Sequence, residues 1–373
     1  MLSKSKFYIS KQTSPDSYLY FEIPFRSIDR SIVHVIDHIQ SVRLSNNESV
    51  SQYRCETYTG FNTYSVEIQF VGSPTNQALE DVIELLFFKP ITQIELDQAK
   101  QTTYLESMKH LIQRKGVFIQ FYDYQALSLR SLGKEYANLL NVKLSDINQV
   151  LQQLIGSTKI TIAHVKNPDD LAKFLPTINL YKSENEVNHS VEKLYKLPKV
   201  INCKPKENSL SFVEIIYQVP TLNLCEYEKA TIKYAIFHDI LRDYLYKLGL
   251  SYGVELLVNE TCYQNTHMIF SMQTIPGSEE KLVEIVGELL AKPLTKYLGV
   301  EKIFQDQLCE SLRVIKTWQQ NQLETDFNHA WQDITFGEEN YVTPEKLEAQ
   351  LKAMTLEKIQ TDLIAIPSSI IIS

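Results

Sequence analysis

Cysteine is scarce in this sequence, and the few cysteines form no recognisable motif. There are five, an odd number, and none belongs to a Cys-x-x-Cys pair. This excludes the commonest cysteine-based metal and redox motifs and is typical of reduced, structural thiols. We therefore expect a cytoplasmic protein.

Basic clusters, phosphate-binding loops and long apolar runs are also missing. The 37 Lys and Arg are scattered and outnumbered by 45 Asp and Glu, which gives a net charge of -8. Nucleic acid and anionic membrane surfaces are thus unfavourable partners. Residues 1–10 lack the apolar core of a signal peptide, and no stretch approaches the roughly 18 apolar residues of a membrane helix, so we expect neither an obvious export signal nor membrane insertion.

The chain contains an internal repeat. Residues 66–70 alternate like a strand, and after a turn residues 77–88 follow a helical pattern that ends at Lys-Pro. The same order recurs at residues 269–274 and 279–290, and the two prolines are 203 residues apart. With 373 residues, 44% of them hydrophobic, the chain is long enough for two cores.

The repeat predicts two homologous domains. We place the first at residues 1–185, a linker rich in Lys, Glu, Asn and Pro at 186–208, and the second at 209–373. Strand patterns alternate with long helix patterns, such as 94–114 and 144–155. Each domain is therefore expected to be α+β, a largely antiparallel sheet with helices packed on one face.

One motif stands out in the first copy, His34-Val35-Ile36-Asp37-His38. On a helix, residues four apart lie on one face, so both imidazoles reach one metal ion. Glu106 follows His38 by 68 residues, on a separate predicted helix that would pack across the first. The alternative is that His34 and His38 are ordinary surface or packing residues.

The second copy is an internal control on this motif. At an offset of 204 residues, His34 corresponds to His238, but Asp37 corresponds to Leu241 and His38 to Arg242. Only the first copy is therefore expected to hold a metal.

The helix that carries Glu106 has a weaker pattern. Its apolar stripe is predicted at Ile94, Leu105, Met108 and Ile112. Glu95 and Asp97 are expected on its solvated face. His110 is expected at the surface, with contact to a metal ligand as the alternative.

These features together resemble the insulinase/pitrilysin family of inverted-motif zinc peptidases. The resemblance rests on His-x-x-acid-His, a carboxylate some seventy residues later, and two similar halves. Gly249-Leu250-Ser251-Tyr252 is also similar to the family's Gly-Leu-Ala-Tyr. The resemblance implies half of a clam-shell chamber, and the chain's size is similar to that of peptidase subunits in bacterial peptide and bacteriocin maturation systems.

The resemblance also implies roles for particular residues. Zn²⁺ would be held by His34, His38 and Glu106, with Asp37 as general base and Tyr252 as a hydrogen-bond donor to the oxyanion. Substrate main chain would add to an edge strand. The residues of that strand are Glu56, Thr57, Tyr58 and Thr59. The alternatives are that Asp37 only orients a histidine, that Tyr252 is an ordinary strand residue and that residues 56–64 form an ordinary sheet edge.

Three positions differ from the family pattern. Asp37 replaces a Glu, Ala99 replaces a Glu, and Leu245 replaces an Arg. A homodimer would lack that arginine at both sites, so we expect a heterodimer with a second family subunit. Two functions follow: a zinc endopeptidase for short or unfolded peptides, or a non-catalytic partner subunit that supplies chamber wall and Tyr252 to the other chain.

Overall fold

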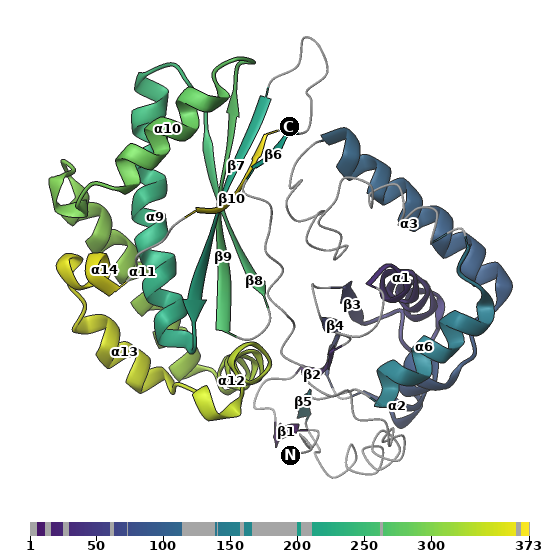
Figure 1. Ribbon diagram of the computed structural model, residues 1–373. Coiled ribbons are helices and arrows are strands. Elements are labelled where there is room, and N and C mark those ends of the chain that lie inside the picture. The colour runs from purple at the N-terminus through teal and green to yellow at the C-terminus, as the bar shows by residue number, and fades with distance from the viewer. Residues whose placement is uncertain are drawn as a thin grey trace. The chain divides into compact units, whose positions relative to one another are not determined.

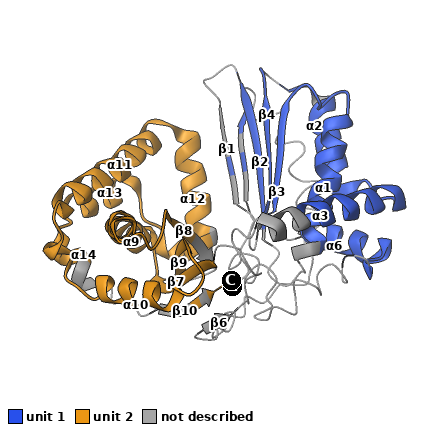
Figure 2. Ribbon diagram, turned by 90° about the horizontal axis from the view of Figure 1, so that it is seen from above, with its two compact units in different colours: residues 1–190 blue, residues 191–373 orange. Residues whose placement is uncertain are grey.

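The computed structural model divides the chain into two compact units, Met1–Ser190 and Val191–Ser373 (Figure 2). The residues it describes are 6–11, 16–24, 30–59, 63–72, 74–113, 139, 141–156, 160–165, 200–202, 211–261, 264–362 and 367–372. Of the predicted linker, only Val200–Asn202 are among them, and these form a strand.

Unit 1 is one five-stranded sheet with helices. Its strands are β1 (Lys6–Lys11), β2 (Ser17–Pro24), β3 (Arg54–Thr59), β4 (Thr63–Phe70) and β5 (Ile160–Val165). They lie in the order β1-β5-β2-β4-β3, and all pairs are antiparallel except β1 with β5. The helices are α1 (Arg30–Asn46), α2 (Asn76–Ile83), the π-helix η1 (Glu84–Phe88), α3 (Gln93–Gln113) and α6 (Leu144–Gly156).

Unit 2 has a second five-stranded sheet. Its strands are β6 (Val200–Asn202), β7 (Ser211–Thr221), β8 (Val254–Thr261), β9 (Gln264–Thr274) and β10 (Pro367–Ile372), in the order β6-β10-β7-β9-β8. Its helices are α9 (Leu224–Lys247), α10 (Glu279–Leu290), α11 (Val300–Gln320), α12 (Gln322–Phe336), α13 (Pro344–Lys352) and α14 (Leu356–Asp362), with 3-10 turns η2 (Leu294–Lys296) and η3 (Glu338–Asn340).

The two sheets have the same topology. Each has one parallel pair at one end, β1 with β5 and β6 with β10, followed by antiparallel pairs in matching order. The two-domain α+β fold predicted from the repeat is therefore confirmed.

Each sheet buries one face against its helices, which Figure 1 shows on one side of the strands in each unit. In β4 the side chains of Tyr64, Val66, Ile68 and Phe70 are buried, and the residues between them are partly exposed. This is the alternation of a strand with one face in a core. It follows the predicted strand pattern of residues 66–70.

The buried face of α3 differs from the predicted stripe. Ile94 and Leu105 are exposed, whereas Leu96, Ala99 and Thr103 are buried. These three recur at helical spacing, and two of them are small, which lets a neighbouring helix approach closely. The side chains of Met108, Ile112 and His110 lie outside the described ones.

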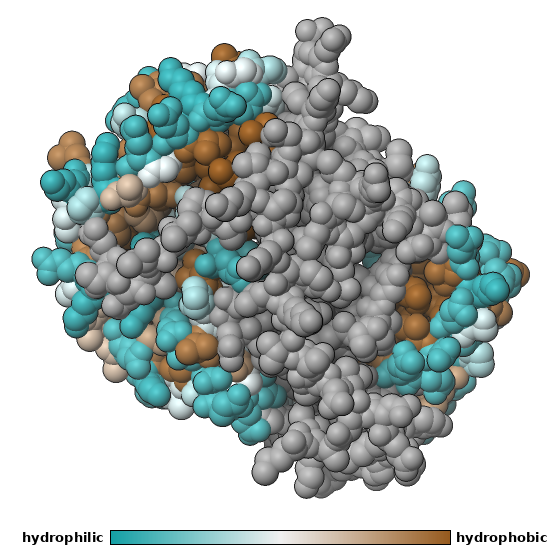
Figure 3. All heavy atoms as spheres, in the orientation of Figure 1, coloured by the Kyte–Doolittle hydropathy of each residue, from teal (hydrophilic) through white to brown (hydrophobic). Residues whose placement is uncertain are grey.

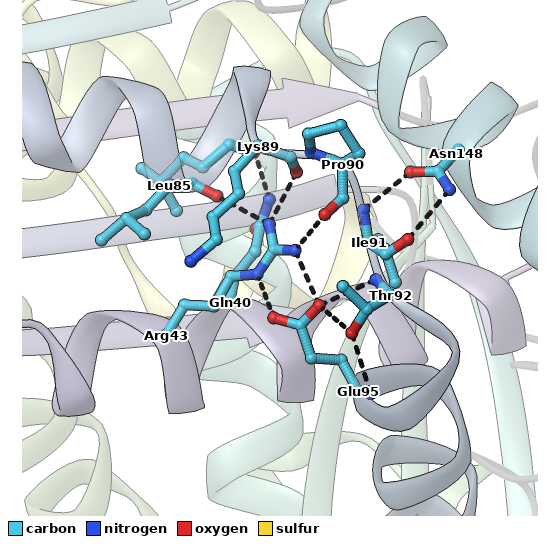
Figure 4. Close-up of polar contacts among 10 residues, drawn as sticks. Gln40, Arg43, Leu85, Lys89, Pro90, Ile91, Thr92, Glu95 and Asn148 are labelled. Carbon is cyan, nitrogen blue, oxygen red and sulfur yellow. Dashed lines mark hydrogen bonds and ion pairs between the residues drawn. The ribbon is translucent and has the colours of Figure 1, made fainter.

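A buried arginine joins α1 to the start of α3 (Figure 4). The Arg43 side chain is only 3% exposed and donates Nε and Nη2 to the two carboxylate oxygens of Glu95, at 2.7 and 3.0 Å. Its remaining donors reach the backbone carbonyls of Leu85 (3.2 Å), Lys89 (2.8 Å) and Pro90 (2.7 Å). All five N–H donors of the guanidinium thus have an acceptor.

Glu95 therefore does not lie on a solvated face, and that prediction is wrong. Its Oε2 also accepts hydrogen bonds from the amide and hydroxyl of Thr92, and the Thr92 hydroxyl accepts one from the Glu95 amide. This is a capping box at the beginning of α3. The Thr-x-x-Glu spacing was the sequence signal for it.

No helix of the described residues is long and apolar enough to cross a membrane. On the face drawn in Figure 3, hydrophobic residues lie in patches among hydrophilic ones.

Phe270 tests the core of unit 2. It is fully buried, with its ring 6.0 Å from that of Tyr217 and 5.8 Å from that of Tyr234. We expect Phe270→Ala to lower the free energy of unfolding by about 3–5 kcal/mol in urea denaturation, because it leaves a cavity. Ile275→Ala, at an exposed position, should change it by about 0.5 kcal/mol or less. Equal effects would contradict this description of the core.

Glu95 predicts a pH dependence of stability. Its hydrogen bonds with Arg43 lower the pKa of the carboxyl from 4.5 to about 2. The folded chain therefore binds fewer protons than the unfolded chain between these values, so the stabilisation is complete above pH 4.5 and is lost as the pH falls towards 2. In urea denaturation, the stability difference between wild type and Glu95→Gln should shrink over this range. A constant difference would contradict the prediction.

Candidate metal centre

Helix α1 brings two imidazoles to one point. His34 and His38 lie one helical turn apart, and their rings stack with centroids 4.8 Å apart and an interplanar angle of 29°. The neighbours Val35, Ile36 and Ile39 are buried in the core and fix the face of the helix that is turned inward. Both histidines lie at the margin of that face, where they are half-buried.

Glu106 of α3 completes the group. Its Oε2 lies 3.3 Å from Nε2 of His34 and 3.1 Å from Nε2 of His38. The three ligand atoms lie within 4.8 Å of one another, and the Glu106 side chain is 41% exposed. The three residues that the sequence predicted as ligands thus converge. Among the described residues, this is the only such group of His, Cys, Asp and Glu.

The donor set fits a zinc ion. Two ligand atoms each about 2.05 Å from zinc and separated by the tetrahedral angle lie about 3.3 Å apart. The two observed N–O distances are close to this value. Hydrogen bonding from His34 lowers the pKa of Glu106 to about 2, and burial, together with His34, lowers the pKa of His38. A neutral imidazole and an ionised carboxylate are the forms that bind metal.

Asp37 lies on the buried side of the histidines. Its residue is 9% exposed, and its Oδ2 accepts a hydrogen bond of 2.8 Å from the Thr59 hydroxyl. Thr59 is the last residue of β3 and is buried. The candidate base is therefore held by the strand on which substrate was predicted to bind.

That strand is the outer strand of the sheet as described, paired on one side with β4. Glu56 and Tyr58 are exposed, and Glu56 accepts two hydrogen bonds from Arg54. Thr57 is half-buried, on the side of Thr59. An outer strand is the structure that strand addition requires, so the substrate-binding prediction for these residues stays a prediction.

Tyr252 belongs to unit 2. The residue follows α9 in the sequence, and it is 88% exposed. The centroid of its ring lies 6.5 Å from that of Tyr246. Leu245, at the position where the family has an arginine, is fully buried. Tyr252 is thus accessible to a ligand, and its role remains a prediction.

The second copy uses the corresponding positions differently. Nε2 of His238 donates to the backbone oxygen of Val254 at 2.8 Å, and Leu241 is buried in the core. Arg242 pairs with Asp239 at 3.3 Å. The counterpart of Glu106, Glu310, is exposed and pairs with Arg313 at 2.6 Å.

Sequence reasoning missed a buried polar residue of α1, Gln40. Gln40 is buried and donates from Nε2 to the backbone oxygen of Leu86 at 2.5 Å, and it accepts a hydrogen bond from the Tyr64 hydroxyl. These bonds join α1 to η1 and to β4. A glutamine on the apolar side of an otherwise hydrophobic helix face was the signal available for Gln40.

The sequence matches no family profile and no curated protein. Solved structures nevertheless have the same fold. The periplasmic protease PqqL from Escherichia coli matches with a TM-score of 0.68 and 12% identity over 98% of this chain and 44% of PqqL. The chain therefore spans less than half the length of PqqL.

Two other structures match over almost their whole length. A protein described as M16-like peptidase from Alicyclobacillus acidocaldarius has a TM-score of 0.66 and 12% identity, over 99% of this chain and 96% of that one. A protease from Helicobacter pylori has a TM-score of 0.69 and 11% identity, over 99% and 96%. The chain thus has the insulinase-like fold of M16-like peptidases over nearly its whole length.

Proposed function

We propose that the chain is a zinc-dependent metallopeptidase subunit that cleaves short or unfolded peptides, a leader or precursor peptide among them. The observation that carries the proposal is the convergence of His34, His38 and Glu106 from two helices, with distances of 3.1 and 3.3 Å that suit tetrahedral zinc. The fold of M16-like peptidases supports it.

In this proposal Asp37 transfers protons, and the three ligands hold the metal ion. Because Oδ2 of Asp37 accepts a hydrogen bond from Thr59, Oδ1 would take the proton from the water that attacks the peptide carbonyl. That proton would pass to the amine as the C–N bond breaks. A Zn²⁺ ion held by the three ligands would supply Lewis acidity, polarising the carbonyl and acidifying water.

Substrate would bind along β3, adding its main chain to the outer edge beside Glu56, Thr57, Tyr58 and Thr59. Tyr252, exposed in unit 2, would donate a hydrogen bond to the developing oxyanion. In a two-chain assembly, this tyrosine would serve the partner's site.

A heterodimer with a second subunit of the same family is the assembly that we propose. Residue 245 is a leucine, so no guanidinium accompanies Tyr252 at the position where the family has an arginine. A second subunit with an intact arginine would complete the site. Peptide or bacteriocin maturation is the pathway that we propose for such a pair.

We also propose a cytoplasmic location. The described cysteines Cys55, Cys225 and Cys309 are all free thiols. Reducing compartments keep thiols in this form.

A second candidate function is that of a non-catalytic partner subunit. The observation that favours it is the position of Asp37, whose shorter side chain is buried and bonded to Thr59. In that case the chain would supply chamber wall and Tyr252, and the metal group would be structural or vestigial.

Metal binding tests the ligand group. His38→Ala and Glu106→Gln should each lower zinc affinity more than about 100-fold in competition with a chelator, because each removes a direct ligand. His238→Ala is the matched control, since His238 occupies the corresponding place in the second copy and should leave the affinity unchanged. Equal zinc affinity of the wild type and all three variants would contradict the proposed site.

Asp37 separates the two functions. With the chain alone and with a second subunit of the same fold, cleavage of a peptide library should fall about 10²–10⁴-fold in Asp37→Ala, because a general base is lost. Asp37→Glu should raise the rate, since an error of about 1 Å in placing a group costs roughly a hundredfold. Activity that is unchanged in Asp37→Ala and His38→Ala would leave only the non-catalytic role.

A further inference from the structure

The ligand group depends on the spacing of two helices. His34 and His38 come from one helix, so their separation is set by helical geometry alone. Glu106 comes from α3, and its distance from both imidazoles is set by how α3 lies against α1. The side chains of α3 are described up to Glu106, and the buried ones on the two turns before it are Ala99 and Thr103, which are both small. A directional interaction between the helices fixes their register in a way that small side chains do not.

We infer that the Arg43–Glu95 ion pair is a positioning device for the metal centre, one that fixes α3 against α1 and thereby holds Glu106 at bonding distance from both imidazoles. This inference rests on the proposed metal site. The two carboxylates on α3 lie 11 residues apart, about three helical turns, so they lie on the same side of that helix. The ion pair and the ligand group are then two separate points of attachment between α1 and α3.

The chemistry of the pair suits this role. The two parallel hydrogen bonds between guanidinium and carboxylate fix orientation as well as distance. Arg43 also binds the carbonyls of Lys89 and Pro90, which lead into α3, and Glu95 closes the capping box at Thr92. The Glu95 side chain in the first turn of α3 and the backbone of the segment that precedes this helix are therefore both bound to α1.

The second copy again acts as a control. Arg43 follows His34 by nine residues, and the residue nine after His238 is Lys247, which is exposed. At the offset of 204 residues that relates Glu106 to Glu310, Glu95 corresponds to Gly299, which directly precedes α11. A lysine and a glycine cannot form such a pair. The ion pair thus occurs in the copy that has the ligand group and is replaced in the copy that lacks it.

The test compares zinc affinity with folding in the full chain. The variants are Arg43→Lys, which keeps the charge but not the paired geometry, and Glu95→Gln, which keeps the shape but not the charge. Glu310→Gln is the matched control, because it breaks an exposed ion pair with the same two-bond geometry on α11. Zinc affinity is measured with a competing chelator, and ligand geometry from the visible spectrum of the cobalt-substituted protein. Thermal unfolding of each metal-free variant is followed by circular dichroism.

We expect both Arg43→Lys and Glu95→Gln to weaken zinc binding about 10–100-fold and to change the cobalt spectrum while the protein is still folded. Glu310→Gln should match wild type in both measurements. A wild-type chain that does not bind zinc overturns the proposed function itself. If wild type binds zinc but the variants match it, or lose metal only at temperatures where they unfold, the positioning role alone is overturned.

Discussion

A metal group drawn from two helices permits little movement between them. Ligand distances must hold within about 0.2 Å for a site to bind its ion well. In unit 1, several interactions limit movement of α1 at once: the apolar side chains Val35, Ile36 and Ile39 in the core, the hydrogen bonds of Gln40, and the five donors of Arg43. The site is therefore a product of the packing around α1 as much as of its three ligands.

Much of the fold could be predicted from periodicity. The strand pattern of residues 66–70 lies within β4, and the helix pattern of 279–290 has the bounds of α10. The buried face of α3 could not be predicted, because the room available beside α1 selects Ala99 and Thr103 over the larger Ile94 and Leu105. The π-helical turn at residues 84–88 could not be predicted either, because its sequence has the pattern of an ordinary α-helix.

The convergence of the ligands could be predicted because helical spacing places His34 and His38 together and because Glu106, 68 residues later, matches the spacing of the family that the motif resembles. The residues that surround the ligands could not be predicted from the sequence. Thr59 meets Asp37 across 22 residues of sequence and Glu95 meets Arg43 across 52, and only tertiary packing creates such contacts. The second copy has the same topology, but its described residues contain no such ligand group, so topology alone does not create the site.

The π-helical turn makes the length of its segment critical. In η1 the amide of Lys89 donates to the carbonyl of Glu84, five residues earlier, at 2.8 Å, so this turn holds one residue more than an α-helical turn. Each residue rotates a helix by about 100°. The carbonyls of Leu85 and Lys89, both bound by Nη1 of Arg43, lie at the two ends of this turn. Deleting one residue between them would change their spacing, so a single guanidinium nitrogen would no longer bind both.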